Sequence, residues 1–450
     1  MSDDLLDYVL IKTLQMQVAD QMTDQKQRRE AHGERELSRA DERQMARSLT
    51  QAAVSRHMEK MMANGVDLPD TSYDARLAQA IDEAMFEAGA ISGLLKGDLI
   101  ENININGCDE VWVKYADERR KVRGSPVTAT DDDLVALVQT LASYGGLNAR
   151  PFSRAHPQLD IRLPDGSRLS AVMSASERPA VAIRRNRYPQ MTMAELLRLG
   201  TVDEQLAGFL RAAVLSRANV VVAGATDAGK TATLRAMINC IPTDERIITI
   251  ERALELGLRR YPELHPDVVE FEEILPDSDG RGGLSMRDLV IRTRRMDPDR
   301  VIFGEVLGPE AMEMLSAMSQ GNNGSLSTIH ARSAVEVFSR LATYSAQYEK
   351  LPFEVTHALI GNAVDYVVYI EKNRKFGGKR CVTTVYEVSG FADGRVTGGF
   401  LFKPSPIDGR AVRTPTTITD ARRLDLEDAG YNDSAAAWAL VDDDAWHVQD

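Results

Sequence analysis

The feature that most constrains this chain is a loop between an apolar run and a helical run, VVVAGATDAGKTATL, residues 220–234. Residues 224–231 satisfy the pattern G-x-x-x-x-G-K-[ST], which binds phosphate groups when it follows a strand and begins a helix. Its glycines allow backbone N–H groups to face phosphate oxygens, the lysine supplies positive charge, and the threonine is a magnesium ligand. The loop therefore predicts binding of ATP and Mg²⁺ by Gly224, Ala225, Thr226, Asp227, Ala228, Gly229, Lys230 and Thr231.

Asp227 is the residue of this loop that phosphate binding does not require. A carboxylate facing the nucleotide would repel the phosphates by an energy on the order of kcal/mol. Two interpretations follow: the side chain points away, toward solvent or a neighbouring subunit, or the loop binds nucleotide weakly. We favour the first, since backbone donors carry the anion binding and a side chain in the variable stretch can turn outward.

Length and charge bound the class of the protein. A chain of 450 residues exceeds one hydrophobic core and predicts two or three domains, and a formal net charge of −13 disfavours direct binding of nucleic acid. The three cysteines are far apart and lack metal-ligand spacing, which suits core residues in a reducing cytosol. No uncharged apolar run reaches the roughly 18 residues of a spanning helix, and the acidic start MSDDLLDY is wrong for a secretory signal. We expect a cytoplasmic protein with a peripheral membrane role at most.

Residues 1–76 are expected to form a helical N-terminal extension. An apolar residue recurs every four positions near the start, at Leu6, Leu10, Leu14 and Val18. This spacing predicts a narrow apolar stripe that another surface covers. Residues 25–48 carry many charges of both signs and are expected as a solvated helix or a mobile connector. Whether the extension packs on its own chain, on a neighbouring subunit or on another protein stays open.

Residues 77–188 are expected to form a compact N-terminal α/β domain. Alternation of apolar and polar residues in ENININGCDEVWVKYADERRKVRG, with a turn at Asn106–Gly107, predicts one β-hairpin. The segment QLDIRLPDGSRLSAVMS, with a turn at Asp165–Gly166, predicts a second hairpin, and PAVAIRRN predicts a further strand.

A second α/β domain is expected over residues 201–404, after a linker at residues 189–200. Short apolar runs alternate there with helical segments, which predicts a mostly parallel sheet flanked by helices. Residues 405–450 are acidic, rich in turn residues and without strong periodicity, so we expect an appended tail.

Acidic residues end two of the apolar runs. Glu305 comes near the end of DRVIFGEV and Glu251 ends RIITIE, where a carboxylate can reach the magnesium ion, directly or through water, and the attacking water. The run GSLSTIHA is expected to bring Thr328 and His330 to the same edge of the sheet, where the histidine could sense the γ-phosphate. The predicted catalytic residues are Glu305, Glu251 and His330.

Arginines are abundant before the Glu305 strand. An arginine that meets the γ-phosphate can raise the rate by roughly 10³ to 10⁵. The run MRDLVIRTRRMDPDR contains five, most of which are expected on the solvated surface. In the first domain, Arg168 follows a turn and Arg184 ends a strand, so either could close over the nucleotide from across the domain boundary.

The sequence motifs described above, in their order along the chain, resemble those of a known family, the secretion and traffic ATPases. Within this family the chain resembles in particular the CpaF-type motors of Tad/Flp pili and related type II/IV secretion systems. The resemblance covers about residues 77–404 and rests on NGCDEVWV, RLPDGSRLSAV, AIRRN, GATDAGKT, IITIERALEL, GRGGLSMRDLV, RRMDPDRVIFGEVLGPEA and GSLSTIHA. It implies an N-terminal α/β, PAS-like domain, a linker, a RecA-like P-loop ATPase domain, six subunits in a ring, and nucleotide bound between the two domains.

The resemblance also implies roles for single residues. Lys230 and Thr231 would hold phosphate and Mg²⁺, and Glu305 would be the catalytic acid of the second nucleotide motif. Glu251 would belong to the acidic box of the family and His330 to its histidine box. Three further residues match arginines that approach the phosphates in relatives: Arg168, Arg184 and Arg295.

The chain departs from the family pattern at three positions. Many relatives have Gly or another small or amide residue where Asp227 stands, an Asp where Arg252 stands, and an Arg where Leu307 stands. The residues Arg252 and Leu307 change the charge near the predicted nucleotide site. The main phosphate and magnesium ligands are intact, so hydrolysis remains the expected activity.

Together these features predict a hexameric ATPase at the inner face of the cell membrane, docked on an inner-membrane platform protein, that powers pilus assembly or protein secretion. A conjugative type IV DNA-transfer ATPase is an alternative within the class, although the acidic balance disfavours DNA contact by this chain. A nucleotide-gated scaffold with little hydrolysis is an alternative from another class, motivated by the three departures.

Overall fold

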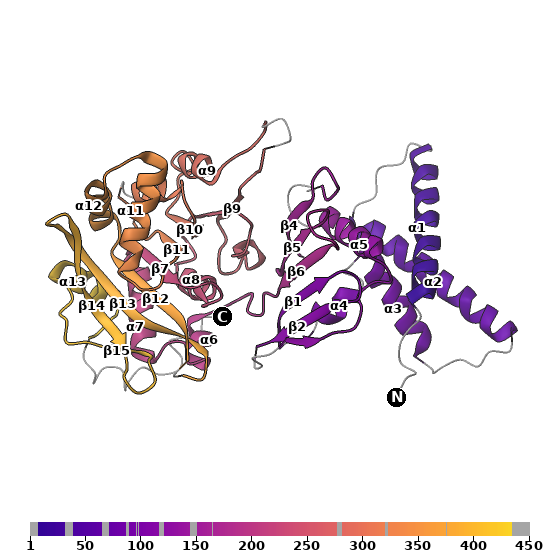
Figure 1. The fold of residues 1–450 in the computed structure, drawn as a ribbon, viewed down its shortest axis with the longest axis horizontal. Coiled ribbons are helices and arrows are strands. Elements are labelled where there is room, and N and C mark those ends of the chain that lie inside the picture. The colour runs from indigo at the N-terminus through magenta and orange to yellow at the C-terminus, as the bar shows by residue number, and fades with distance from the viewer. Residues whose placement is uncertain are drawn as a thin grey trace. The chain divides into compact units, whose positions relative to one another are not determined.

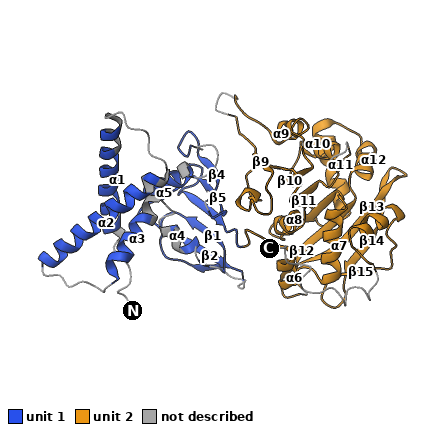
Figure 2. Cartoon of the chain, turned by 180° about the vertical axis from the view of Figure 1, so that it is seen from behind, with its two compact units in different colours: residues 1–187 blue, residues 188–450 orange. Residues whose placement is uncertain are grey.

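The computed structural model in Figure 1 describes residues 8–31, 39–64, 72–86, 90–95, 97, 99–116, 121–144, 151–163, 165–276, 281–319, 323–374 and 376–433. The chain divides into two compact units, residues 1–187 and residues 188–450, which Figure 2 colours separately. Both units combine helices with a β-sheet, so the predicted mixed α/β class is confirmed.

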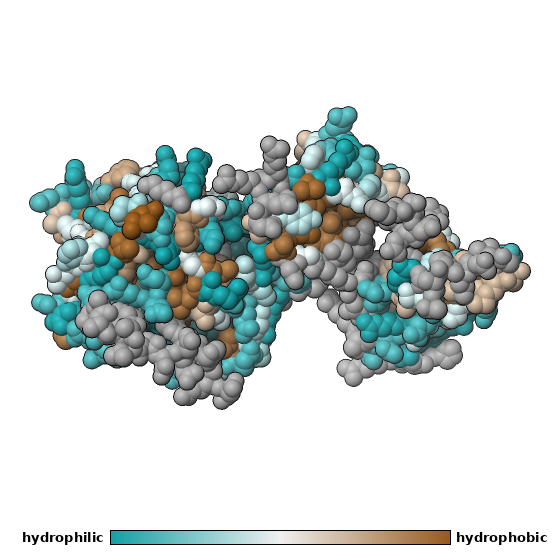
Figure 3. All heavy atoms as spheres, turned by 90° about the horizontal axis from the view of Figure 1, so that it is seen from below, coloured by the Kyte–Doolittle hydropathy of each residue, from teal (hydrophilic) through white to brown (hydrophobic). Residues whose placement is uncertain are grey.

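The surface carries both hydrophilic and hydrophobic side chains. In the view of Figure 3, exposed hydrophobic residues lie among hydrophilic ones, as on ordinary globular surfaces. Within the described part of the chain, no helix is both long enough and apolar enough to span a membrane.

Unit 1 contains five described helices and one six-stranded sheet. Its helices are α1 (Tyr8–Ala31), α2 (Arg39–Ala63), α3 (Tyr73–Phe86), α4 (Ala90–Leu95) and α5 (Asp131–Tyr144). Its strands are β1 (Ile100–Asn106), β2 (Val111–Tyr115), β3 (Lys121–Arg123), β4 (Gln158–Arg162), β5 (Arg168–Val172) and β6 (Ala180–Arg184).

The first three helices pack on one another through a small apolar cluster. Leu14 and Val18 of α1 are buried in it, against residues of α2 and α3, and Leu10 is partly buried beside them. Leu6, the first residue of the expected stripe, lies outside the described residues. Helices of the same chain therefore cover the stripe. The described part of the charged segment 25–48 is helical, in α1 and α2.

The sheet of unit 1 has the strand order β3-β2-β1-β6-β5-β4, and every neighbouring pair is antiparallel. Both expected hairpins are confirmed, since β1 pairs with β2 and β4 pairs with β5. Gly107 and Gly166 adopt φ of +84° and +89° in the two turns, which glycine does without strain. Alternate residues such as Ile103 pack against Leu134 and Val138 of α5 in the core.

The described residues of unit 2 form a nine-stranded sheet with helices around it. Its helices are α6 (Met193–Arg198), α7 (Glu204–Leu215), α8 (Lys230–Ile238), the 3-10 helix η1 (Leu258–Arg260), α9 (Met286–Thr293), α10 (Ala311–Ser319), α11 (Glu336–Glu349), α12 (Phe353–Ala363) and α13 (Asp420–Asp428). Its strands are β7 (Val220–Gly224), β8 (Ile247–Glu251), β9 (Val268–Glu272), β10 (Arg300–Val306), β11 (Leu326–His330), β12 (Tyr366–Asn373), β13 (Lys379–Ala392), β14 (Arg395–Pro404) and β15 (Ala411–Arg413).

The strand order in unit 2 is β15-β14-β13-β12-β7-β11-β10-β8-β9. The six strands from β12 to β9 pair in parallel, as predicted, and β13, β14 and β15 extend the sheet with antiparallel pairs. Because the central strands are parallel, the loops and side chains that follow their carboxyl ends meet at one edge. That edge holds the loop after β7.

Two apolar cores cover the two faces of this sheet. The core that contains α7 and α8 is centred on Phe209, whose ring lies 5.1 Å from Tyr366, 5.5 Å from Phe402 and 5.4 Å from Tyr431 between centroids. The other core contains residues of α9, α10, α11 and α12. The sheet therefore has the fully buried strands expected of a parallel α/β domain.

The segment expected as a linker, residues 189–200, contains α6. Thr192 caps this helix, because its hydroxyl accepts the Glu195 N–H at 3.2 Å. Met193 and Leu196 are buried in the core that contains Phe209. The segment thus packs on unit 2 in the structure.

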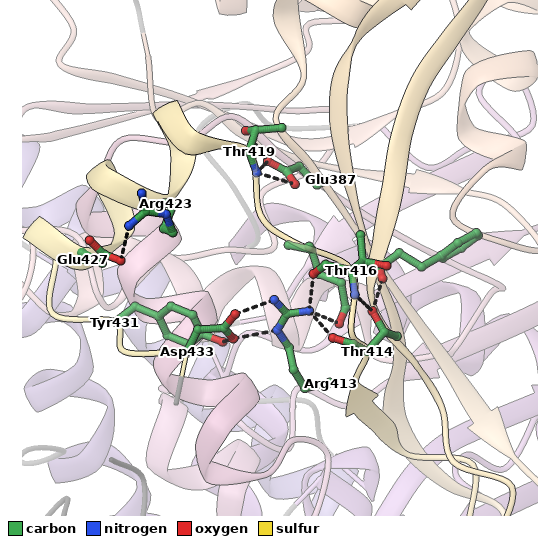
Figure 4. A network of polar contacts seen from close by, with 11 residues as sticks. Glu387, Arg413, Thr414, Thr416, Thr419, Arg423, Glu427, Tyr431 and Asp433 are labelled. Carbon is green, nitrogen blue, oxygen red and sulfur yellow. Dashed lines mark hydrogen bonds and ion pairs between the residues drawn. The ribbon is translucent and has the colours of Figure 1, made fainter. Parts of the chain in front are cut away.

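Residues 405–433 are also built into unit 2, which differs from the expected appended tail. β15 pairs with β14, and α13 contacts α7. In Figure 4, Arg413 donates to both carboxylate oxygens of Asp433 at 2.7 and 2.6 Å, and Thr419 Oγ1 donates to Glu387 Oε1 at 2.7 Å. The sequence pattern was weak because α13 buries one residue of its nine, Leu426. Residues 434–450 of the expected tail lie outside the described residues.

Asn219 immediately precedes β7 and joins several segments at the amino edge of the sheet. Its Nδ2 donates to the carbonyl oxygens of Met318 at 3.0 Å and Ala363 at 2.8 Å. Its Oδ1 accepts the N–H groups of Gly324 and Ser325, each at 3.0 Å. The side chain is 4% exposed, so its removal would leave these four backbone groups in a dry site.

We predict that Asn219→Ala lowers the free energy of unfolding by about 3 kcal/mol or more, because each unsatisfied buried group costs roughly 1–3 kcal/mol. Urea unfolding followed by circular dichroism measures the change. Asn362→Ala, at an exposed position of α12, is the matched control and should stay within about 0.5 kcal/mol of the wild type. Equal stability of Asn219→Ala and wild type would contradict the role of Asn219.

Candidate functional site

The loop of residues 224–231 joins β7 to α8, as predicted, and two of its glycines are required by the geometry. A Cβ on Gly224 would lie 2.3 Å from the carbonyl oxygen of Ile370 in β12. Gly229 caps α8 with φ of +106°, a left-handed conformation that favours glycine. The loop therefore lies directly against β12, and it ends where the first N–H groups of α8 lack partners within the helix.

Lys230 is the buried cation of this loop. Its side chain is 7% exposed, and Nζ donates to the carbonyl oxygen of Ala225 at 3.1 Å. Nζ also lies 3.9 Å from Glu305 Oε1. The N-terminus of α8 adds its own partial positive charge beside the ammonium group. The loop therefore concentrates positive charge and donor groups, which is the chemistry that an anion such as phosphate recognises.

His330 connects Lys230 to Glu305. Its Nε2 lies 2.7 Å from Glu305 Oε1, and its Nδ1 lies 3.2 Å from Lys230 Nζ. Because an ammonium group can only donate, Nδ1 accepts from Lys230, and the Nε2–H then donates to the carboxylate. The histidine therefore fixes the orientation of Glu305 at the mouth of the loop.

Thr328, expected at the same edge, has a structural contact instead. Its hydroxyl is buried and donates to the carbonyl oxygen of Gly304 at 2.7 Å, which ties β11 to β10 just before Glu305.

Glu251 ends β8, as predicted, but its side chain is 2% exposed. Its Oε2 accepts the N–H groups of Glu255 at 2.7 Å and Leu256 at 3.0 Å. Its Oε1 has no hydrogen-bond partner among the described residues. Burial raises the pKa of Glu251 to about 8, and the two backbone hydrogen bonds oppose that shift. The Glu251 carboxylate thus holds the backbone that follows β8.

Glu251 also fits closely against the strand that carries Glu305. A Cβ on Gly304 would lie 2.8 Å from Cγ of Glu251, so only glycine leaves room for this carboxylate. The backbone of β10 and the Glu251 side chain are therefore packed together, and Glu305 follows directly.

Two residues that sequence reasoning missed complete this side of the loop. Thr231 Oγ1 donates to Glu255 Oε2 at 3.2 Å, which brings a second carboxylate to the predicted magnesium ligand. Arg235 of α8 is buried and donates to the carbonyl oxygens of Glu255 at 2.9 Å and Leu256 at 3.2 Å. The signal for Glu255 was its position four residues after Glu251. Arg235 gave no signal, because an arginine in a helix is usually solvated.

The Asp227 side chain is paired within the chain and is not simply solvated. Its carboxylate forms ion pairs with Lys372 of β12 and Arg380 of β13, and the side chain is 23% exposed. The sequence led us to expect a side chain directed toward solvent or a neighbouring subunit, whereas the structure pairs it within its own chain. What the sequence did not indicate is that two cations of the same chain receive it.

The predicted arginines lie in different parts of the chain. Arg168 of β5 and Arg184 of β6 are direct cross-strand partners on the exposed face of the sheet in unit 1. Arg295 is exposed after α9 in unit 2. No contact recorded for the described residues joins Arg295 to the loop. The structure therefore brings Lys230, Glu305 and His330 of unit 2 together, and Arg295 is not recorded in contact with them among the described residues.

The two other departures from the family pattern have local contacts. Arg252 is exposed, and its Nε lies 3.2 Å from Glu273 Oε2. Leu307 is half-buried, and its N–H donates to the buried carboxylate of Glu310. Neither residue is recorded in contact with Lys230, Glu305 or His330 among the described residues.

The donor groups around the loop of residues 224–231 fit a nucleoside triphosphate with Mg²⁺. No group of three or more His, Cys, Asp or Glu side chains among the described residues could hold a metal ion by itself. Mg²⁺ on a nucleotide needs one or two protein oxygens, because phosphates and waters supply the others. The Thr231 hydroxyl, which contacts the Glu255 carboxylate, and the Glu305 carboxylate beside Lys230 would be the oxygens to supply them.

Comparison with known proteins gives the family. Residues 86–370, more than half of the chain, match the family model described as type II/IV secretion system protein. The chain belongs to this family. It is 30% identical over 338 residues to a putative conjugal transfer protein of Mycobacterium tuberculosis, which covers 73% of this chain and 92% of that protein. It is 29% identical over 330 residues to the type IV secretion system protein PtlH of Bordetella pertussis, which covers 67% of this chain and 94% of that protein.

A solved structure within the same class is also similar. The VirB11 ATPase of the Brucella suis type IV secretion system, in complex with sulphate, is 25% identical and has a TM-score of 0.35. The similarity covers 66% of this chain and 95% of that chain.

The buried Glu251 should make the stability of this protein depend on pH. The pKa of about 8 in the folded chain lies above the ordinary value of 4.5, so ionisation of Glu251 opposes folding increasingly as the pH rises through that window. Glu251→Gln removes the charge and keeps an oxygen acceptor. We therefore expect the melting temperature of Glu251→Gln minus that of the wild type to rise as the pH increases from about 5 to about 8.

Differential scanning fluorimetry across that window measures the difference. Glu354→Gln, at an exposed position of α12, is the matched control and should show a constant difference. A Glu251→Gln difference that falls as the pH rises would reverse the sign and refute the assignment.

Proposed function

We propose that this protein binds ATP with Mg²⁺ at the loop of residues 224–231 and hydrolyses it. The observation that supports this proposal most is the contact chain from Lys230 through His330 to Glu305. It places a cation, a histidine and a carboxylate at the mouth of a helix N-terminus, where the terminal phosphate of a nucleotide binds in such loops.

The roles of the residues follow from their contacts. Lys230 and the first N–H groups of α8 hold the phosphate oxygens. The Thr231 hydroxyl, with Glu255 and Glu305 directly or through water, holds the magnesium ion, which when bound neutralises charge that develops on the phosphates.

Glu305 orients the attacking water and accepts its proton, since its carboxylate is 35% exposed and remains reachable. His330 keeps the Glu305 carboxylate in place and is positioned to respond to the γ-phosphate. Glu251 supports these groups by holding the backbone of Glu255 and Leu256 beside Thr231.

We further propose that the protein works as a homohexamer of the CpaF type, at the cytoplasmic face of the inner membrane and docked on a membrane platform protein. Residues 77–188 then act as the PAS-like N-terminal domain and residues 201–404 as the RecA-like ATPase domain, with nucleotide between them. In the ring, Arg168, Arg184 and Arg295 approach the phosphates. Family membership and a relative named as a type IV secretion system protein support this, and the work done is pilus assembly or protein secretion.

A DNA-transfer machine is the second candidate. The relative of Mycobacterium tuberculosis is named as a putative conjugal transfer protein. The net charge of −13 favours a motor that does not itself bind DNA. Tight association with DNA in a filter-binding assay at physiological salt would move the assignment to a DNA-contacting ATPase.

We predict that Glu305→Gln lowers magnesium-dependent ATP turnover by about 10²-fold or more, since general-base catalysis contributes roughly 10²–10⁴-fold. Nucleotide affinity should change little, because the backbone donors and Lys230 remain. Phosphate release, nucleotide binding and light scattering on the same purified samples measure rate, affinity and ring size. Glu354→Gln, exposed on α12, is the matched control and should turn over like the wild type.

The outcomes separate the candidates. A hexamer whose turnover depends on Glu305 supports a motor. A ring that binds nucleotide tightly without turnover indicates the nucleotide-gated scaffold. A wild-type chain that binds no nucleotide overturns the proposal.

A further inference from the structure

Two cations face each other beside the phosphate loop. Lys372 of β12 and Arg380 of β13 are direct cross-strand partners in an antiparallel pair. Like charges at such a position destabilise a sheet unless an anion lies between them. The side chains of Lys372 and Arg380 are 38% and 30% exposed, so solvent alone does not separate the charges completely.

Asp227 supplies that anion from the loop. One carboxylate oxygen contacts Lys372 Nζ, and the other accepts from Arg380 Nη2 at 2.8 Å. Arg380 Nε also donates to the backbone carbonyl oxygen of Asp227 at 3.0 Å. Three contacts therefore fix one residue of the loop, through both its side chain and its backbone.

The backbone conformation of the loop depends on this residue. Asp227 has φ of +62°, in the left-handed region that residues with a side chain rarely adopt. The neighbouring Gly229 packs on the same arginine, since a Cβ there would lie 3.2 Å from Arg380 Cδ. The part of the loop just before Lys230 therefore rests on Arg380.

We propose that Asp227 is a positioning residue for nucleotide binding, and that its carboxylate, held by Lys372 and Arg380, fixes the phosphate loop in its binding conformation. The proposal rests on the proposed function of the same loop. It assigns Lys372 and Arg380 as counter-ions of the loop, so they do not hold the phosphates directly. The carboxylate that the motif does not require thus fastens the loop to β12 and β13.

A rival arrangement makes the opposite prediction. If Lys372 and Arg380 serve the phosphates, Asp227 competes with the nucleotide, and its removal strengthens binding. If Asp227 positions the loop, its removal weakens binding, because the loop loses its attachment and orders only when nucleotide arrives.

The experiment is a titration of the full chain with a fluorescent ATP analogue and Mg²⁺, together with steady-state ATP turnover. Asp227→Asn removes the charge and retains a residue type that tolerates the left-handed region. Asp227→Gly removes the charge and also relieves the backbone. We expect both to raise Kd about tenfold, which corresponds to the loss of a small ion-pair network, while kcat at saturation stays within about twofold.

Asp393→Asn is the matched control, because Asp393 is also left-handed, with φ of 50°, and lies exposed in the turn between β13 and β14. Its affinity should equal that of the wild type. Lys372→Gln should also weaken binding, and the double variant Asp227→Asn/Lys372→Gln should bind no more weakly than Asp227→Asn alone. Raising the salt concentration from about 0.05 M to about 0.5 M should narrow the gap between wild type and Asp227→Asn, since these charges are partly exposed.

Each result decides one question. Wild-type affinity in Asp227→Asn and Lys372→Gln, or tighter binding in Asp227→Gly, overturns the positioning role while the proposed function stands. An additive loss in the double variant also overturns it, because independent effects add. The melting temperature of each variant shows whether it folds. If one of Asp227→Asn, Asp227→Gly and Lys372→Gln does not fold, the other two still test the proposal. A wild type that binds no analogue overturns the proposed function itself.

Discussion

The parallel pairing of β7, β11 and β10 is the constraint on which the site depends. His330 pairs with Gly224, and Ile329 pairs with Val306, so the ends of three strands reach the same edge of the sheet. Side chains alternate along a strand, and a slip of one residue in either pairing would turn His330 or Glu305 to the other face. The contact from Lys230 through His330 to Glu305 therefore follows from strand register. The buried Asn219, at the opposite edge, helps to hold that register.

Two carboxylates end neighbouring strands, and their surroundings give them different properties. Glu305 is 35% exposed and accepts from His330, which suits a group that meets water and nucleotide. Glu251 is 2% exposed, and burial raises its pKa to about 8. A carboxyl group that resists ionisation and accepts two N–H groups serves the backbone better than it serves proton transfer. The sequence showed two acids in equivalent positions, and only burial separates their roles.

The sequence predicted the parts that local patterns determine. The loop, both hairpins of unit 1 and the strands that end at Glu251 and His330 follow from alternation, apolar runs and glycine positions. Contacts between distant segments left no such pattern. Arg235 carried no signal in the sequence, although its side chain donates to the Glu255 carbonyl oxygen. The residues after 404 looked like a tail because their helix buries one side chain.

Asp227 shows why a residue that departs from its motif needs to be judged with its partners. Its two cations lie 145 and 153 residues further along the chain, and both follow the residues 86–370 that match the family model. Lys372 and Arg380 would repel each other across β12 and β13, and Asp227 would repel phosphate if it turned inward. Each charge is unfavourable alone, and the group of three is satisfied. The loop of residues 224–231 is therefore connected to β13, which pairs with β14. β14 in turn pairs with β15, whose Arg413 binds Asp433 of the C-terminal segment.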